Sequence, residues 1–234
     1  GNARHAVRQT HVMRRALEYA ATLGLTVFLY PEDPWLAGDG CVHEGTVSAR
    51  LGLPAIPECA EIIGLARDLE LVAQTGVRAH FCQLSSARAV DMVAEARVRG
   101  LPVSADVSAH QLFLTEMDVG QFNSRCHLQP PLRSQRDMEG LRRGLGRGVI
   151  SAICSDHQPH DPDAKLAPFA ATEAGASTLE TLLPLTLRLV DEGVLALPEA
   201  IAAVTRGPAE VLGLEAGTLA EGARADVCIV DPRT

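Results

Sequence analysis

The sequence has few aromatic residues and no run of basic residues. Phe, Trp and Tyr together make up 3% of its 234 residues, and the formal net charge is -8. Nucleic-acid-binding proteins use basic patches to contact phosphates and aromatic rings to stack on bases, so this composition argues against a nucleic-acid partner. No apolar run approaches the ~20 residues of a membrane-spanning helix, so we expect no membrane association through such a helix.

Paired cysteines are also missing. Six cysteines are scattered along the chain without a C-x-x-C pair. Cys82 and Cys154 lie in apolar stretches, where we expect thiols to pack as small hydrophobes rather than to form a separate zinc site. We therefore expect reduced thiols and a cytoplasmic protein. The chain begins with the polar residues Gly-Asn-Ala-Arg-His and not with a signal peptide, so we expect a fragment or a processed chain.

The sequence does contain a regular alternation of apolar runs and helical patterns. The apolar runs predict strands near 25–31, 77–85, 101–108 and 149–156. Helical spacing predicts helices at 10–21, 58–75, 86–99, 135–145, 176–192, 197–205 and 208–213. The segment 32–57 is rich in Gly and Pro and is expected to be a long loop with a short helix at most. This alternation predicts an α/β fold with right-handed βαβ units and a parallel sheet.

Four such units make half of an eight-stranded barrel. Four parallel strands cannot close on themselves, so we expect residues 1–214 to form the second half of a (β/α)8 TIM-type barrel, with the N-terminal half absent from this chain. The tail differs, because Gly-rich turns precede an alternating pattern at 226–230. We expect residues 215–234 to belong to a small β-sandwich domain.

In such a barrel the functional side chains lie at the carboxyl ends of the strands. Asp156, His157 and His160 follow the fourth predicted strand, where they either form one corner of a metal centre or serve as a helix cap and loop residues. His80 lies inside a predicted strand, and we favour a hydrogen-bonded core histidine there. The other strand ends are Tyr30 to Asp33, Gln83 to Ser86 and Asp106 to His110.

Several segments resemble the dihydroorotase branch of the amidohydrolase superfamily. They are HEGTVSARLGLP at 43–54, PPLRS at 130–134, SDHQPH at 155–160 and GTLAEGARADVCIVDP at 217–232. The resemblance covers essentially the whole chain, aligned with the later half of a dihydroorotase. It implies a zinc centre in the barrel mouth, with ligands from an HxH on the first strand, an acidic or carbamylated residue on the fourth, His on the fifth and sixth, and Asp on the eighth. Zinc in such a site makes a bound water nucleophilic.

Only part of this ligand set is matched. Asp156 matches the eighth-strand Asp, whereas Tyr30 and Gln83 stand where the family has His ligands. A phenol with a pKa near 10 and a neutral amide are poor zinc ligands. The fourth-strand position falls near Asn2 or Ala3, and the HxH segment is not in this chain.

The positions that contact substrate in the family are also partly matched. His160 matches a substrate-binding His, while Gln129 stands where the family has Asn before PPLR. The Pro-Phe-Gly loop of the family reads Pro-Phe-Ala at 168–170. Arg133, after the double proline, either binds a substrate anion or pairs with a nearby carboxylate, and the sequence leaves both open.

Two further segments, HFCQLSSAR at 80–88 and DAKLAPFAATE at 163–173, resemble the non-catalytic dihydroorotase-like subunits that some bacteria use to assemble aspartate transcarbamoylase. This resemblance implies a pseudo-dihydroorotase of pyrimidine biosynthesis without a cofactor, in a homo- or hetero-oligomer with the aspartate transcarbamoylase catalytic subunit. One alternative is an active zinc-dependent cyclic amidohydrolase with further ligands from outside this chain, in which Asp156 transfers the proton and His160 positions the substrate carboxylate. Another is a sensor that binds a pyrimidine-like anion without turning it over.

Overall fold

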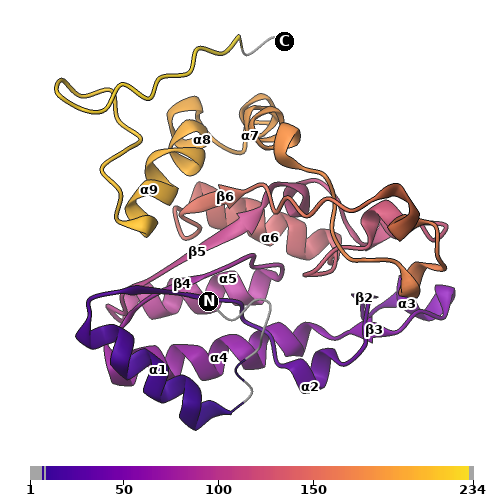
Figure 1. Cartoon of the computed structure of the whole chain (residues 1–234). Helices are drawn as coiled ribbons and strands as arrows, with labels where there is room; N and C mark the ends of the chain where they lie inside the picture. Colours follow the sequence, from indigo (N-terminus) through magenta and orange to yellow (C-terminus); the bar gives the residue numbers. More distant parts are fainter. Residues whose placement is uncertain (1–6, 8, 232–234) are drawn as a thin grey trace.

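The computed structural model describes residue 7 and residues 9–231. Its centre is a parallel sheet of four strands in the order β1-β4-β5-β6 (Figure 1). The α/β fold and the parallel sheet are confirmed, and each strand lies inside the segment predicted for it. The strands are β1 (Thr26–Leu29), β4 (Arg78–Phe81), β5 (Val103–Ser108) and β6 (Ala152–Cys154).

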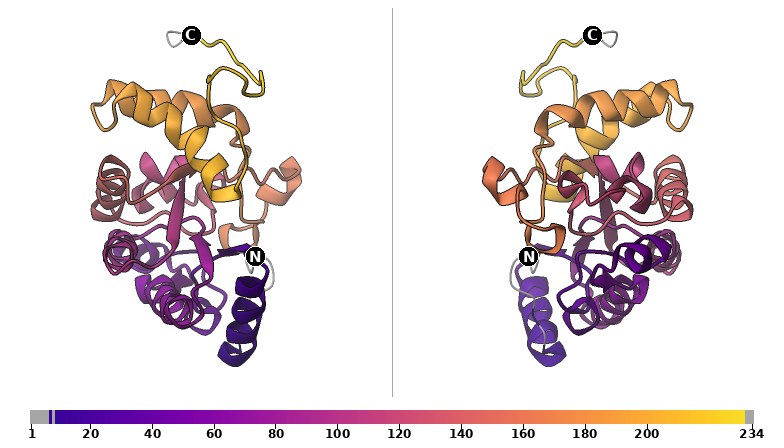
Figure 2. Two further views of the ribbon diagram at one scale, coloured as in Figure 1. Left: turned by 90° about the vertical axis from the view of Figure 1, so that its left-hand side faces the viewer. Right: turned by 90° about the vertical axis from the view of Figure 1, so that its right-hand side faces the viewer.

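Helices cover one side of this sheet, where Figure 2 shows α4, α5 and α6 stacked side by side. Apolar side chains that face them, such as Phe81, Ala105 and Val107, are fully buried in the main core. The helix termini follow local rules: Ser86 and Ser134 cap the next helices by accepting backbone N–H hydrogen bonds. The longer helices are α1 (Thr10–Thr22), α4 (Glu58–Thr75), α5 (Ala87–Val98), α6 (Gln135–Gly146), α7 (Leu182–Asp191), α8 (Leu197–Val204) and α9 (Arg206–Leu212).

The segment 32–57 has more structure than we expected. It contains α2 (Pro34–Ala37) and α3 (Thr46–Leu51), and a second, two-stranded parallel sheet of β2 (Val42–His43) and β3 (Ala55–Ile56). The prediction of a loop with one short helix at most is wrong here. Two-residue strands carry no periodic pattern, so sequence alone gives them no signal. The helix expected from 176 also begins later, with a 3-10 turn at Leu179–Thr181 before α7.

The C-terminal segment differs from the prediction as well. In the described part of the tail, up to residue 231, the expected strand at 226–230 does not form, and Ile229 is 94% exposed. Figure 1 shows this segment leading away from α9 without a neighbouring strand. A strand needs a partner for its backbone hydrogen bonds, and the described residues offer none there. The assignment of 215–234 to a small β domain stays a prediction.

The face of the sheet opposite α4, α5 and α6 carries polar side chains. Successive residues of a strand point to opposite faces, so His80 of β4 and Ser104, Asp106 and Ser108 of β5 share one face. The strands β4, β5 and β6 end next to one another, and this arrangement positions the site described below. Among the described helices, none is both long enough and apolar enough to cross a membrane.

Candidate functional site

Asp156 lies at the centre of the polar cluster where the strands end. Its side chain is only 4% exposed. The Gln83 side-chain amide and the Gln158 amide, the latter at 2.7 Å, both donate to Oδ1, while the Ser108 hydroxyl donates to Oδ2 at 3.3 Å. Both carboxylate oxygens therefore accept hydrogen bonds from the chain itself.

The backbone positions Gln83 for this contact. Gln83 and Asp156 both adopt the left-handed conformation, with φ of 57° and 51°, which is unusual for residues other than glycine. The Gln83 N–H donates to Oδ1 of Asp106 at 2.7 Å, so its main chain is tied to β5 while its side chain reaches Asp156. Such strained positions are common where a side chain must be aimed at a site.

His110 is a member of this cluster to which the sequence assigned no role. Its side chain is 6% exposed, and its Nε2 lies 3.8 Å from Oδ2 of Asp156. Among the described residues neither ring nitrogen has a hydrogen-bond partner. Burial lowers the pKa of His110, and the nearby Asp156 carboxylate opposes that shift only in part. The only available sequence signal was its place at the end of the third predicted strand.

Tyr30 lies close to the same cluster. It is buried, and burial followed by the charge of Glu32 raises the pKa of its phenol well above the ordinary value. The cavity beside it has a volume of ≈ 10 Å³, which is about the space of one water molecule. It is lined by Tyr30, Pro31, Glu32, Glu61, Gln83, Pro130 and Arg133.

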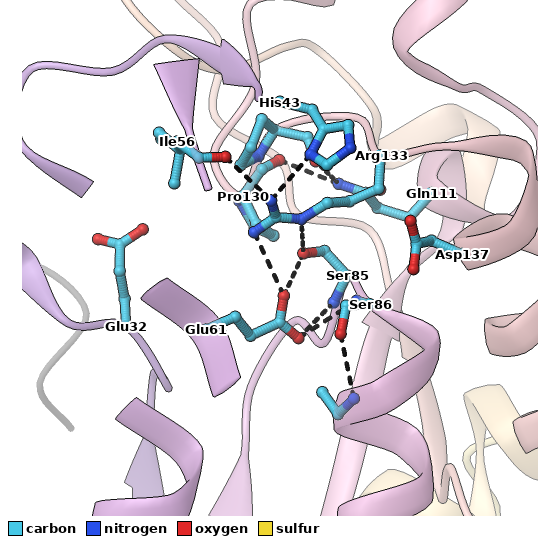
Figure 3. A network of polar contacts seen from close by, with 12 residues as sticks. Glu32, His43, Ile56, Glu61, Ser85, Ser86, Gln111, Pro130, Arg133 and Asp137 are labelled. Carbon is cyan, nitrogen blue, oxygen red and sulfur yellow. Dashed lines mark hydrogen bonds and ion pairs between the residues drawn. The ribbon is translucent and has the colours of Figure 1, made fainter. Parts of the chain in front are cut away.

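Arg133 forms the centre of a buried polar network (Figure 3). The residue is 3% exposed, and each guanidinium nitrogen faces a protein partner. Nε donates to the Ser85 hydroxyl at 2.9 Å, one terminal nitrogen donates to the Ile56 carbonyl and to His43 Nδ1, both at 3.1 Å, and the other lies 3.6 Å from Glu61 Oε2. Of the two roles left open for Arg133, the carboxylate pair is thus present in the structure, and substrate binding stays a prediction.

Glu61 of α4 is the anion of this network. Ser85 and Ser86 donate their backbone N–H groups to Glu61 Oε1 at 2.9 and 3.3 Å, and the Ser85 hydroxyl donates to Oε2. Burial raises the pKa of Glu61, while Arg133 and these donors act in the opposite direction. The network therefore joins α4, the end of β4, the segment 43–56 and the PPLR segment.

The remaining expected site residues make contacts elsewhere. Gln129, whose peptide bond to Pro130 is cis, donates to Glu32 Oε1 at 3.3 Å. His160 is exposed, and its Nε2 donates to the Ala174 carbonyl at 2.9 Å within its own loop. The structure thus brings Tyr30, Gln83 and Asp156 together, with Arg133 beside the same small cavity. The fourth-strand position near Asn2 or Ala3 lies outside the described residues.

The side chains at the positions where the dihydroorotase resemblance implies zinc ligands do not fit a zinc ion. The Asp156 carboxylate accepts three hydrogen bonds, and the Gln83 amide presents its N–H side, which cannot ligate a metal, to that carboxylate. Tyr30 would have to lose a proton whose pKa is raised further by burial. Zinc binds deprotonated, electron-donating side chains, and these residues do not supply a set of them.

Comparison with known proteins agrees with this fold. Residues 37–234 match the sequence profile of the Amidohydrolase family. The chain belongs to the amidohydrolase family. One solved structure, the L-hydantoinase (dihydropyrimidinase) from Arthrobacter aurescens, superposes on this chain with a TM-score of 0.84. The superposition covers 94% of this chain and 51% of the hydantoinase chain. Its 24% sequence identity supports a shared fold alone.

Some sequence relatives of this amidohydrolase-family chain have a higher sequence identity to it than the L-hydantoinase does. A "Dihydroorotase-like protein" of Pseudomonas aeruginosa is 52% identical over 232 residues, which cover 99% of this chain and 55% of the relative. A "Dihydroorotase" of Syntrophotalea carbinolica is 44% identical over 228 residues, which cover 97% of this chain and 54% of the relative. The chain therefore spans about half the length of the relatives that it matches.

Proposed function

We propose that this chain is part of a dihydroorotase-like protein of pyrimidine biosynthesis that does not hydrolyse dihydroorotate and serves as a structural subunit for aspartate transcarbamoylase. The observation that supports the non-catalytic role is the hydrogen bonding of Asp156. Gln83, Gln158 and Ser108 direct hydrogen-bond donors at Asp156, and a donor group such as the Gln83 N–H cannot ligate a metal.

The neighbouring side chains support the same proposal. Gln83 and Tyr30 supply no imidazole at the two positions where the dihydroorotase resemblance implies one, and His160 bonds to its own loop. The Arg133 and Glu61 network nevertheless holds the strand ends and the PPLR segment firmly together. A structural subunit needs a well-ordered scaffold, and it does not need a complete reaction centre.

Assembly is tested with the full-length protein and the aspartate transcarbamoylase catalytic chain of the same organism. We expect the mixture to elute as one complex whose mass by light scattering exceeds that of either component. Asp156→Asn is the control variant, and it should assemble equally well because the proposed role does not use the Asp156 carboxylate. Separate elution of the two wild-type proteins at micromolar concentrations would contradict the proposed partner.

The second candidate is an active cyclic amidohydrolase, favoured by the similarity to proteins named dihydroorotase. It requires an HxH segment upstream of this chain and a different arrangement around Asp156. The double variant Tyr30→His/Gln83→His separates the two candidates. Under our proposal the variant stays inactive toward dihydroorotate with added zinc, whereas clear hydrolysis would show that only these two ligands were missing.

A further inference from the structure

Helix α1 has a second apolar side in addition to the one that packs on the core. Met13 and Leu17 form the core side and are 3% and 0% exposed. A separate row of apolar residues recurs at spacings of four, three and four positions, which places its members on one side of a helix. The row, which we call the outer face of α1, consists of Val12, Ala16, Tyr19 and the C-cap residue Leu23.

The outer face is exposed in the described part of the chain. Val12, Tyr19 and Leu23 are 43%, 70% and 56% exposed. By contrast, α4 and α5 each expose one large apolar residue, Ile63 and Val98 respectively. A surface helix buries one apolar stripe and presents polar residues elsewhere, whereas a helix with a wider apolar arc is covered on more than one side. The outer face therefore requires a cover.

Polar residues of α1 are confined to its third side. Arg14 and Arg15 both pair with Glu18, at 3.0 and 2.7 Å. Helical spacing places His11 and Thr22 on the same side. Contact with solvent is thus provided by this polar side, and the outer face lies between it and the buried core side.

The position of α1 in the fold indicates what covers its outer face. β1 is the first strand in the order β1-β4-β5-β6, so within the described chain one edge of β1 pairs with β4 and the other edge pairs with no strand. Helix α1 packs on β1 and α4, and Figure 2 shows it beyond α4 at the end of the row that continues through α5 and α6. An unpaired strand edge beside an exposed apolar helix face can accept one more strand and one more helix.

Building on the longer dihydroorotase-like protein of the proposed function, we propose that the outer face of α1 and the free edge of β1 bind a helix and a parallel strand from the upstream part of the same polypeptide. The matched segments make up only 55% and 54% of two relatives, so a protein of their length contains enough further chain. A helix suits the outer face, because rows of residues spaced by three and four interdigitate with such rows on another helix. A parallel strand continues the all-parallel sheet.

The test uses the full-length protein without any transcarbamoylase chain. Ala16→Cys places a small thiol on the outer face, and Val98→Cys, at a position that is 90% exposed on α5, is the matched control. Each introduced thiol is labelled with a maleimide, located by peptide mass spectrometry and compared with its own rate in urea. We expect Ala16→Cys to react at least about tenfold more slowly in the folded than in the unfolded protein, whereas Val98→Cys reacts at similar rates in both.

A stability measurement provides the second readout. Tyr19→Glu should lower the urea midpoint of the full-length protein, because it places a charge in a buried helix contact. Val98→Glu should leave the midpoint unchanged. Equal midpoints for the two glutamate variants would contradict the proposed contact.

The labelling also distinguishes the possible occupants of the outer face. Protection that is independent of protein concentration supports the upstream segment. Rapid labelling of Ala16→Cys would show that nothing covers the outer face, and protection that disappears on dilution would assign it to a second copy. Protection that arises only when the transcarbamoylase catalytic chain is added would assign the outer face to that partner, and each of these three results would overturn the proposal. Neither readout measures hydrolysis, and the main comparison needs no partner, so failure here is distinguishable from failure of the proposed function.

Discussion

Arg133 is the central cation of the buried polar network. A buried guanidinium is stable only when each of its donors has a partner, and here the partners are Glu61, Ser85, His43 and the Ile56 carbonyl. The sequence indicated that Arg133 would bind an anion or a carboxylate. It could not indicate Glu61, because the two residues are 72 positions apart and no local pattern links them.

Removing the cation should therefore be costly. Arg133→Met leaves the buried Glu61 carboxylate without its counter-charge, and we expect the free energy of unfolding to fall by about 3–5 kcal/mol in urea titrations. Adding Glu61→Gln should recover part of this loss, because the neutral amide oxygen can still accept the Ser85 N–H. As a matched control, Arg143→Met disrupts the exposed pair with Glu139 and should cost less than about 1 kcal/mol. Equal effects of the two arginine variants would contradict the buried-pair account.

His43 gives the same network a pH dependence. Burial and the charge of Arg133 lower the pKa of His43 to about 4. Between this value and the unfolded value near 6.5, the unfolded chain binds a proton that the folded chain does not. The contribution of His43 to stability is therefore fully present above about pH 6.5 and is lost as the pH falls toward 4.

The corresponding test compares wild type with His43→Asn, whose amide oxygen can accept the hydrogen bond from Arg133. We expect the free energy of unfolding to depend less on pH between 6.5 and about 4 in the variant. Burial also lowers the pKa of His110 and His127, and these contributions cancel in the comparison. Parallel pH profiles for the two proteins would show that His43 does not titrate as described.

At the scale of elements, the packing of α5 on α6 depends on glycine. A Cβ at Gly140 of α6 would lie 2.3 Å from the Ala87 Cβ and 2.8 Å from its Cα at the start of α5. Neither atom belongs to a flexible side chain, so the helices would have to separate. Gly146, at the end of the same helix, has no comparable neighbour, because its Cβ would lie 3.5 Å from the Val194 carbonyl oxygen.

These two glycines form a matched pair of variants. Gly140→Ala should destabilise the protein by about 1–3 kcal/mol, because overpacking outweighs the gain of about 1 kcal/mol in helix propensity. Gly146→Ala should leave the stability unchanged or raise it by up to about 1 kcal/mol. Thermal and urea unfolding measure both variants. An equally stable Gly140→Ala protein would show that α5 and α6 pack less closely than the structure indicates.

Helices and strands long enough to show a periodic pattern could be predicted from the sequence. Elements that form only by pairing with a distant segment could not. Buried strands and amphipathic helices have periodic patterns with glycine stops, and the four strands lie where the patterns place them. The strands β2 and β3 are too short to show a periodic pattern. The alternation at 226–230 predicts a strand, but that segment has no neighbouring strand in the described chain. For the site, the approach of Gln83 to Asp156 followed from the strand ends, while His110 and Glu61 needed the three-dimensional fold.

At the scale of the whole molecule, the fold gathers at the strand ends the positions where the dihydroorotase resemblance implies metal ligands. The strands deliver Tyr30, Gln83 and Asp156 to one small region, as the barrel architecture requires. There the Asp156 carboxylate accepts hydrogen bonds from Gln83, Gln158 and Ser108. The chain spans about half of its relatives, so activity must be measured on the full-length protein.

The most direct test is the rate of dihydroorotate hydrolysis by the full-length protein with added zinc, next to an active dihydroorotase under the same conditions. Ring closure of carbamoyl aspartate should be followed as well, since an enzyme accelerates both directions. We predict no rate above the uncatalysed reaction in either direction. A rate comparable with that of the active enzyme would contradict the account, because it would mean that Asp156 releases its hydrogen bonds to serve a working reaction centre.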